Sequence, residues 1–311
     1  PSSLPAERQA SRSPSTPLSL ALSPRRLASS GRTAQAPRPL KPLTLAAGLN
    51  EKVITPETTY FDKGYLILDN YKIENFDQKG RGEITMQKVL EESLNTGAAF
   101  AAGKLGKENL RKYFLAYGLG EKTGITLPGE VNGNVSNLYS KRGVEYATAS
   151  FGQGLATTPL EFARAVSALA NGGKLMKPYL VERILRPGRE DIITKPQVIR
   201  EVITPETSET IKKMLVKVVD TALLGGTVKL KHWTAAAKTG TAQIPLVGAK
   251  GYSEDFLHSF FAWAPGFDSR FLLFLYIEKP QGVKYASQSL GPYFQEIMNF
   301  LLTYYEVPPD R

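Results

Sequence analysis

Three strand-like segments follow one another in the C-terminal third of the sequence, and they constrain the fold more than any other feature. They cover residues 234–243, 259–264 and 271–277. Several helical patterns precede this group, and another, at about residues 292–305, follows it. Helices, then successive strands, then a closing helix are typical of an α+β fold. We therefore predict an antiparallel sheet flanked by helices.

Local signals predict where several helices begin and end. Thr158-Pro159-Leu160-Glu161 is a capping box with proline at the first helical position. Residues 43–49 form a compact helical pattern. Thr85 can cap a helix over residues 86–95, which we expect to be followed by a turn at Gly97-Ala98-Ala99-Phe100.

Residues 1–36 differ in composition from the rest of the chain. Ser, Pro, Ala and Arg dominate this segment, and it shows neither strand nor helix periodicity. Residues 1–41 also hold seven basic side chains and one acidic, which is more than half of the net charge of +10. Two interpretations stay open for residues 1–36: a disordered tail, or a shifted reading frame that is not the native sequence. Residues 37–311 are predicted to form the folded domain.

Composition excludes several classes of function. The chain has no cysteine, so disulfides, zinc-thiolate sites and cysteine nucleophiles are excluded. The two histidines, His232 and His258, lack metal-ligand spacing, and we expect neither a metal nor a cofactor. The folded part is only mildly basic, which argues against a nucleic-acid partner. No apolar run approaches the ~18–20 residues of a membrane span.

The first strand segment carries Ala237-Lys238-Thr239-Gly240-Thr241-Ala242-Gln243. An edge strand presents unpaired backbone groups that can pair with an extended ligand. Lys238 adds a positive charge beside that edge, and Gly240 leaves room for close approach of a ligand backbone. Thr239 and Thr241 alternate onto one face. These features favour a binding edge over an ordinary edge strand guarded by a lysine.

A hydroxyl and an amide stand two residues apart in Ser93-Leu94-Asn95. Residues i and i+2 do not face together within a helix, so both can reach a cleft only where the chain leaves the helix. The alternative is a plain polar pair at the end of a helix.

Lys41 follows Arg38 by three residues, in Arg38-Pro39-Leu40-Lys41. In a Ser-x-x-Lys pattern at a helix N-terminus, the hydroxyl and the amine lie on one face, and the amine can accept the hydroxyl proton. Here Arg38 stands at the position of the serine and cannot attack a carbonyl. The pattern Ser-x-x-Lys occurs nowhere else in the 311 residues.

From Pro42 to Arg311 the chain resembles the transpeptidase domain of class B penicillin-binding proteins, of the septal or elongation type, within the serine β-lactamase/DD-peptidase superfamily. The order and separation of the matching segments also resemble that family. The segments are Lys41–Leu49, Ser93–Asn95, Ser150-Phe151-Gly152-Gln153-Gly154 with Thr158-Pro159, Lys238–Thr241, and Glu278-Lys279-Pro280-Gln281-Gly282 with the helix that follows.

The resemblance implies a role for each matched residue in a serine acyltransferase that is acylated by D-Ala-D-Ala stem peptides or by penicillin. Lys41 would be the general base, and Ser93 would relay protons. Asn95 would bind the substrate amide. Lys238 and Thr239 would hold the substrate carboxylate, Gly240 would belong to the same substrate-binding segment, and the Thr241 backbone N–H would belong to the oxyanion hole.

The resemblance also implies a setting in cell-wall synthesis, at the outer face of the cytoplasmic membrane. Expected partners are stem peptides, the lipid-linked precursor, β-lactams, and division or elongation (cell-shape) proteins including a glycosyltransferase. The membrane anchor and pedestal domain of class B members are missing from these residues, so we expect a fragment of a longer protein.

Three hypotheses remain because Arg38 replaces the nucleophile. In the first, the chain is an active transpeptidase whose N-terminal segment is misread or truncated. In the second, it is a pseudoenzyme that binds division or elongation partners. Under both hypotheses the chain as written is expected to be inactive, because it lacks the nucleophile. A β-lactamase or β-lactam sensor is the third, disfavoured because no deacylating carboxylate motif is evident.

Overall fold

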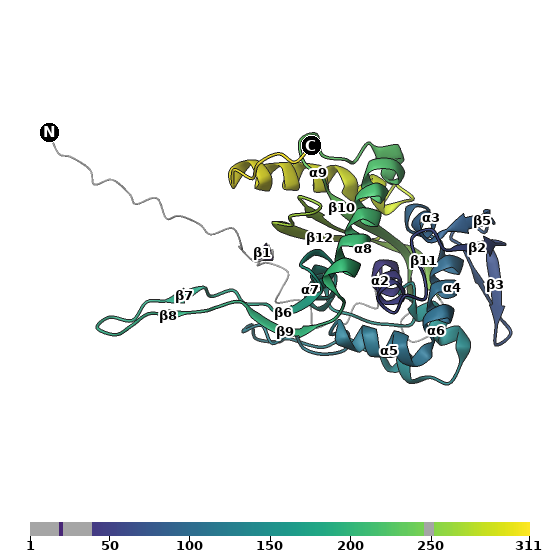
Figure 1. Cartoon of the computed structure of the whole chain (residues 1–311), viewed down its shortest axis with the longest axis horizontal. Coiled ribbons are helices and arrows are strands. Elements are labelled where there is room, and N and C mark those ends of the chain that lie inside the picture. Colours follow the sequence, from purple (N-terminus) through teal and green to yellow (C-terminus); the bar gives the residue numbers. More distant parts are fainter. Residues whose placement is uncertain (1–18, 21–38, 246–251) are drawn as a thin grey trace.

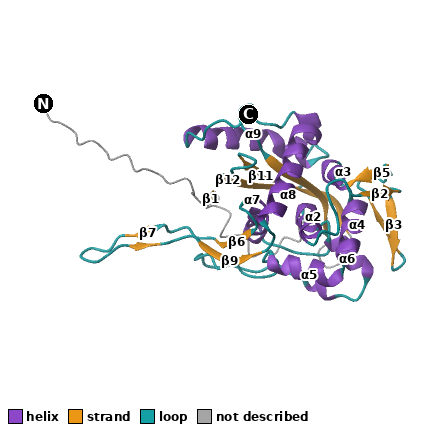
Figure 2. Cartoon of the chain, in the orientation of Figure 1, coloured by secondary structure: helices purple, strands orange, loops and turns teal. Residues whose placement is uncertain are grey.

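The computed structural model describes residues 19–20, 39–245 and 252–311. Its central sheet has the strand order β1-β12-β11-β10 (Figure 1), and Figure 2 shows the strands of this sheet in orange among the purple helices. β10, β11 and β12 pair antiparallel, and β1 pairs parallel to β12. The predicted antiparallel sheet with flanking helices is therefore confirmed, with one short parallel pair that the patterns did not indicate. The strands are β1 (Ser19–Leu20), β10 (Ala236–Pro245), β11 (Tyr252–Ala264) and β12 (Phe271–Glu278).

Helices cover both faces of this sheet (Figure 1). Successive residues of a strand point to opposite faces. Phe260 of β11 stacks on Phe294 of α9 (Ala286–Tyr304), with ring centroids 5.2 Å apart. Its neighbour Phe261 meets Phe162 of α7 (Pro159–Ala170) edge to face at 5.9 Å. The C-terminal helix therefore packs on one face of the sheet, and α7 packs on the other.

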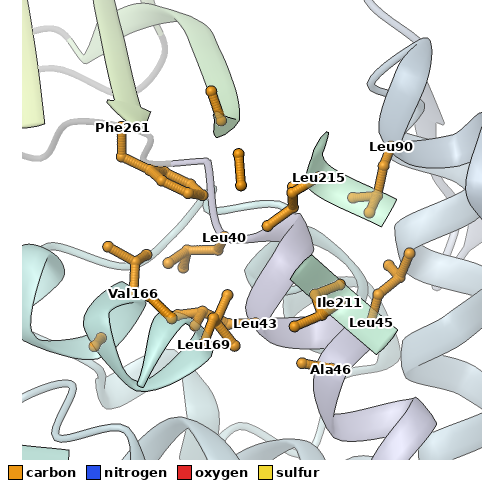
Figure 3. Packing of buried hydrophobic residues seen from close by; sticks show 14 of the residues in the cluster. Leu40, Leu43, Leu45, Ala46, Leu90, Val166, Leu169, Ile211, Leu215 and Phe261 are labelled. Atoms are coloured by element: carbon orange, nitrogen blue, oxygen red, sulfur yellow. The ribbon is translucent and has the colours of Figure 1, made fainter. Parts of the chain in front are cut away.

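The helix α2 (Lys41–Asn50) lies at the centre of the core, as Figure 3 shows for Leu43, Leu45 and Ala46. It packs against α4 (Asn95–Leu105), α5 (Lys107–Ala116), α7 and α8 (Pro205–Lys217). Every residue from Lys41 to Gly48 is buried, so the helix has no solvent-facing side over this stretch. It begins two residues earlier than the sequence pattern indicated, and Lys41 is its first residue.

The predicted capping box of α7 is confirmed, and its carboxylate makes further contacts beyond the start of the helix. Thr158 accepts a hydrogen bond from the Glu161 backbone N–H, and the Glu161 carboxylate accepts one from the Thr158 N–H, both at 3.1 Å. The same carboxylate accepts from the backbone N–H groups of Gly120 and Gly133. Burial raises the pKa of Glu161. One buried carboxylate thus ties the start of α7 to two loops.

The expected helix over 86–95 and the turn after it are wrong in their boundaries. The helix α3 (Met86–Glu91) is capped by Thr85 as predicted, but it ends four residues earlier. A new helix, α4, starts at Asn95 and runs through the expected turn at 97–100. No side chain of its own N-cap residue, Leu94, caps this helix. The cap comes from Asn75, twenty residues away, which a local pattern cannot reveal.

The remaining elements surround this centre, and a two-stranded arm projects from the body (Figure 1). Of the segment 1–36, only β1 is described, and the other residues of the expected tail lie outside the described residues. No helix in the described ranges is both long and apolar enough to cross a membrane. The elements are the pairs β2 (Thr59–Asp62) with β5 (Gly82–Thr85), β3 (Tyr65–Leu68) with β4 (Tyr71–Glu74), β6 (Lys174–Lys177) with β9 (Gln197–Glu201) and β7 (Arg183–Ile184) with β8 (Ile192–Ile193), the helix α6 (Gly143–Ala149), and the short helical turns η1 (Ser136–Tyr139), η2 (Val218–Ala222) and η3 (Leu223–Gly226).

Truncation of a core side chain of α2 tests its central place. Leu43 is fully buried, so Leu43→Ala should lower the free energy of unfolding by about 2–5 kcal/mol, through lost burial and the cavity left behind. Leu185→Ala is the matched control, because Leu185 is 72% exposed. Urea unfolding followed by circular dichroism measures both. Equal losses for the two variants would contradict a core centred on α2.

Candidate active site

One cleft brings together all seven residues that the sequence motifs singled out. Its volume is about 360 Å³, and it opens beside the edge strand β10. The motif residues that line it come from α2, from the α3–α4 connection, from the start of α4 and from β10. They are Lys41, Ser93, Asn95, Lys238, Thr239, Gly240 and Thr241.

The Ser93 hydroxyl lies between the Nζ atoms of two lysines. Lys41 Nζ is 3.3 Å from Ser93 Oγ, and Lys238 Nζ donates to the same oxygen at 2.8 Å. Lys238 Nζ also donates to the Thr239 carbonyl at 3.1 Å. The three side chains are separated by 52 and 145 residues in the sequence, so only the fold brings them together.

Both lysines are removed from water, which changes their titration. Lys41 is 9% exposed and Lys238 is 1% exposed. Burial, and then the charge of Lys238, lower the pKa of Lys41 well below its usual range. Burial lowers the pKa of Lys238 to about 7. A neutral amine beside a hydroxyl can accept a proton, so this group of side chains can move protons near neutral pH.

Ser93 occupies an unusual backbone position at the end of α3. Its φ is +57°, a left-handed conformation that is rare outside glycine. The Leu94 N–H donates to the Val89 carbonyl at 3.0 Å, and Glu92 is the C-cap residue of the helix. This is a Schellman ending with serine where glycine is usual. The chain therefore leaves the helix at Ser93, which is what the sequence argument required for both polar side chains to reach a cleft.

Asn75, which the sequence analysis did not identify, holds this connection in place. Its Oδ1 accepts hydrogen bonds from the backbone N–H groups of Asn95 and Thr96, at 3.0 and 3.2 Å, and from Thr96 Oγ1 at 3.0 Å. Its Nδ2 donates to the buried carboxylate of Asp62 at 2.9 Å and to the Lys79 carbonyl at 3.2 Å. Asn75 is 2% exposed, so these bonds are shielded from water. Asn95 in turn donates from its side chain to the Glu74 carbonyl at 2.9 Å.

On β10, Gly240 and Thr241 have defined neighbours. A Cβ atom on Gly240 would lie 2.7 Å from Ser259 Oγ and 3.2 Å from Pro39 Cδ. Because glycine has no side chain, Pro39 of the same chain can pack closely against position 240, where the sequence analysis expected only a ligand. Thr241 Oγ1 accepts from the Ala286 N–H at 3.2 Å. β10 is an edge strand, as predicted.

The Ser150–Gly154 segment also reaches the cleft, through Phe151 and Gln153. Lys41 Nζ lies 5.9 Å from the centre of the Phe151 ring. Thr44 of α2 donates to the Ser150 carbonyl at 2.7 Å, which fixes this segment against the helix that carries Lys41. The segment 278–282 does not line the cleft, whereas the residues that start α9, Tyr285 to Ser287, do.

Charged residues on the rim were also missed by the sequence analysis, because no motif marks them. Arg81 pairs with Asp77 at 2.8 Å and with Glu92 at 2.7 Å. The Arg81 guanidinium lowers the pKa of Asp77. These contacts connect the loop after β4 to the residue next to Ser93. Arg38, at the position of the expected nucleophile, lies outside the described residues. Among the described residues, no group of three His, Cys, Asp or Glu side chains is placed to hold a metal ion.

Comparison with known proteins gives a consistent result. Residues 40–299 match the family model described as penicillin binding protein transpeptidase domain. Stage V sporulation protein D of Bacillus subtilis is 33% identical over 275 residues, which is 87% of this chain and 42% of that protein. Peptidoglycan D,D-transpeptidase FtsI of Escherichia coli is 29% identical over 277 residues, 87% of this chain and 44% of that protein. The chain spans less than half the length of these relatives.

Solved structures agree with the same fold. The apo transpeptidase domain of Burkholderia pseudomallei penicillin-binding protein 3 superposes with a TM-score of 0.76 at 27% identity. The match covers 88% of this chain and 80% of that domain.

The two buried lysines predict a specific dependence of stability on pH. Both pKa values are lower in the folded chain, and that of Lys238 is about 7. Above that pH the unfolded state binds more protons than the folded state, so stability rises with pH until the unfolded lysines titrate, near pH 10. Each lysine increases the free energy of unfolding by at most about 1.4 kcal/mol per pH unit over this range. Lys238→Met should flatten this rise between pH 7 and 9, and urea unfolding across that range measures it. Lys72→Met, at an exposed position, is the control; an unchanged slope in Lys238→Met would contradict the buried, neutral lysine.

Loss of the Asn75 side chain should loosen the Ser93–Asn95 connection. Asn75→Ala leaves the first N–H groups of α4 without this acceptor, so we expect a loss of about 1–3 kcal/mol in the free energy of unfolding. Hydrogen exchange at the amides of Asn95 and Thr96 should accelerate more than exchange elsewhere in α4. Asn171→Ala, at a half-buried asparagine whose side chain bonds to the Lys174 backbone, should cost less than about 1 kcal/mol. Unchanged exchange at 95 and 96 would contradict the capping role.

Proposed function

Because the chain belongs to the family of penicillin-binding protein transpeptidase domains, we propose that its cleft binds peptidoglycan stem peptides ending in D-Ala-D-Ala, and β-lactams as their mimics. The observation that carries the proposal is the position of one hydroxyl, Ser93, between Lys41 and Lys238 beside an edge strand. An edge strand supplies backbone hydrogen bonds to an extended peptide, and Lys238, once protonated, supplies positive charge for its carboxylate.

Within this proposal each motif residue has a physical task. The ligand carboxylate binds at Lys238 and Thr239, and its negative charge raises the pKa of Lys238, which then stays protonated while ligand is bound. Asn95 binds the substrate amide. The backbone N–H of Thr241 stabilises a developing oxyanion. Lys41 accepts a proton, and Ser93 passes protons between the two amines.

Arg38 decides between the two candidate functions. With a serine at position 38, the chain would be a D,D-transpeptidase that forms a serine acyl-enzyme and passes the acyl group to an acceptor amine. With arginine there, that step has no nucleophile, and loss of a nucleophile typically costs several orders of magnitude in rate. The second candidate, a pseudoenzyme that binds stem peptides or partner proteins, is favoured by this one residue.

The proposed setting is cell-wall synthesis at the outer face of the cytoplasmic membrane. In support, one relative is named a peptidoglycan D,D-transpeptidase and another a sporulation protein. Division or elongation proteins, with a glycosyltransferase among them, are the proposed partners, and the lipid-linked precursor supplies the stem peptide.

Restoring the nucleophile tests the proposal directly. Arg38→Ser should give covalent labelling by a fluorescent penicillin through an ester, which mild hydroxylamine releases. The unchanged chain, and an Arg186→Ser control in the connection between β7 and β8, which does not line the cleft, should give no hydroxylamine-sensitive label. A folded Arg38→Ser protein that never forms the ester would show that position 38 is not the nucleophile's place.

A further inference from the structure

Lys41, which lines the cleft, differs from Lys212, a deeply buried lysine that lies outside it. Lys212 is 5% exposed, and its Nζ lies 2.8 Å from a Glu209 carboxylate oxygen and 3.2 Å from the Phe267 carbonyl. Lys41 is similarly buried, but across the described residues its Nζ meets only the Ser93 hydroxyl and the Phe151 ring. Lys41 also lines a cleft that a small molecule can enter. Its amine is therefore largely shielded from bulk water but can be reached by a ligand in the cleft, and no carboxylate lies beside it in the described part of the chain.

The charged groups around the cleft do not favour the ammonium form of Lys41. Lys238, from β10, is the nearest, and its charge lowers the pKa of Lys41 further than burial alone. Of the carboxylates that line the cleft, Asp77 and Glu92 pair with Arg81. The remaining one, Glu91, pairs with Lys88 at 2.5 Å. None of these acids is thus placed to hold a proton on Lys41.

We propose that Lys41 is itself a nucleophile, which opens β-lactams bound in the cleft and keeps them as a permanent amide. Entry of the β-lactam rests on the function proposed above, whereas the covalent step does not require a serine at position 38. A neutral lysine amine in a desolvated pocket is an established kind of protein nucleophile. An ordinary lysine is only about 0.1% neutral at pH 7.5, so exposed lysines compete poorly.

The step balances with the groups at hand. The Lys41 Nζ lone pair attacks the β-lactam carbonyl carbon, and the new C–N bond forms as the strained ring C–N bond breaks. Nζ loses one proton, and the ring nitrogen gains one. Ser93 can carry it, since its oxygen lies within 3.3 Å of Lys41 Nζ and can pass its own proton to the leaving nitrogen. Ser93 takes up the proton that Nζ loses as it gives its own, and Lys238, at 2.8 Å, holds the Ser93 hydroxyl in place without a net change in its own protons.

The product distinguishes this chemistry from serine acylation. An ester on a hydroxyl is cleaved by hydroxylamine and turns over slowly in water, whereas an amide on Lys41 resists both. Each chain would therefore react once and stay blocked, with one ligand for every folded molecule.

The experiment uses the unchanged chain, with Arg38, and benzylpenicillin at pH 7.5. Intact mass spectrometry and peptide mapping should find one adduct, on Lys41, that survives hydroxylamine. Its rate of formation should exceed that of the exposed lysines Lys72 and Lys112 by at least about tenfold, given the difference in neutral fraction. Unfolding in urea before addition of the drug should abolish this preference.

Variants and a binding measurement separate this inference from the proposed function. Lys41→Met should lose the adduct, and Lys212→Met should keep it; if Lys41→Met does not fold, the peptide map of the unchanged chain decides alone. Reversible binding of a D-Ala-D-Ala peptide, measured by calorimetry, reports on the cleft separately. No adduct, or an adduct on Ser93 or on surface lysines only, overturns the proposal for Lys41 whether or not the peptide binds. Absence of peptide binding overturns the proposed function instead.

Discussion

The cleft depends on keeping two lysine amines out of water beside a single serine hydroxyl. Burial of an unpaired charge is costly, and amines in this position respond by giving up their protons. The surrounding fold must therefore hold Lys41 and Lys238 in place against their tendency to reach solvent. It does so by placing one on the first turn of a helix that is buried all round, and the other on a strand packed between helices and a neighbouring strand.

The third member of the group, Ser93, is held by contacts of a different kind. Its connection is short and polar, and Asn75, Asp62 and Thr96 form a buried hydrogen-bonded network beneath it. Fully satisfied networks of this kind specify one arrangement, because each member left unpaired would lose a desolvated hydrogen bond. Apolar packing therefore fixes the positions of the two lysines, and a polar network fixes the position of the serine.

Sequence patterns predicted the features that arise from local rules. The antiparallel sheet, the capping box at Thr158 and the edge position of β10 follow from periodicity and from side-chain chemistry within a few residues. The start of α4 could not be predicted this way, since its cap is Asn75 from a separate strand end. The seven motif residues were placed by resemblance and do line one cleft. Asn75 and Arg81 carry no motif, so only the folded chain reveals them.

The left-handed ending of α3 has a consequence for how this domain can change over time. Glycine adopts that conformation without a steric penalty, so a serine there makes the turn less favourable than it could be. Selection for thermal robustness alone would drive position 93 toward glycine, and that change would remove the hydroxyl between the two amines. Backbone strain and the hydroxyl contacts of Ser93 therefore favour different residues at position 93, and variants selected only for heat resistance are expected to lose the contacts that Lys41 and Lys238 make there.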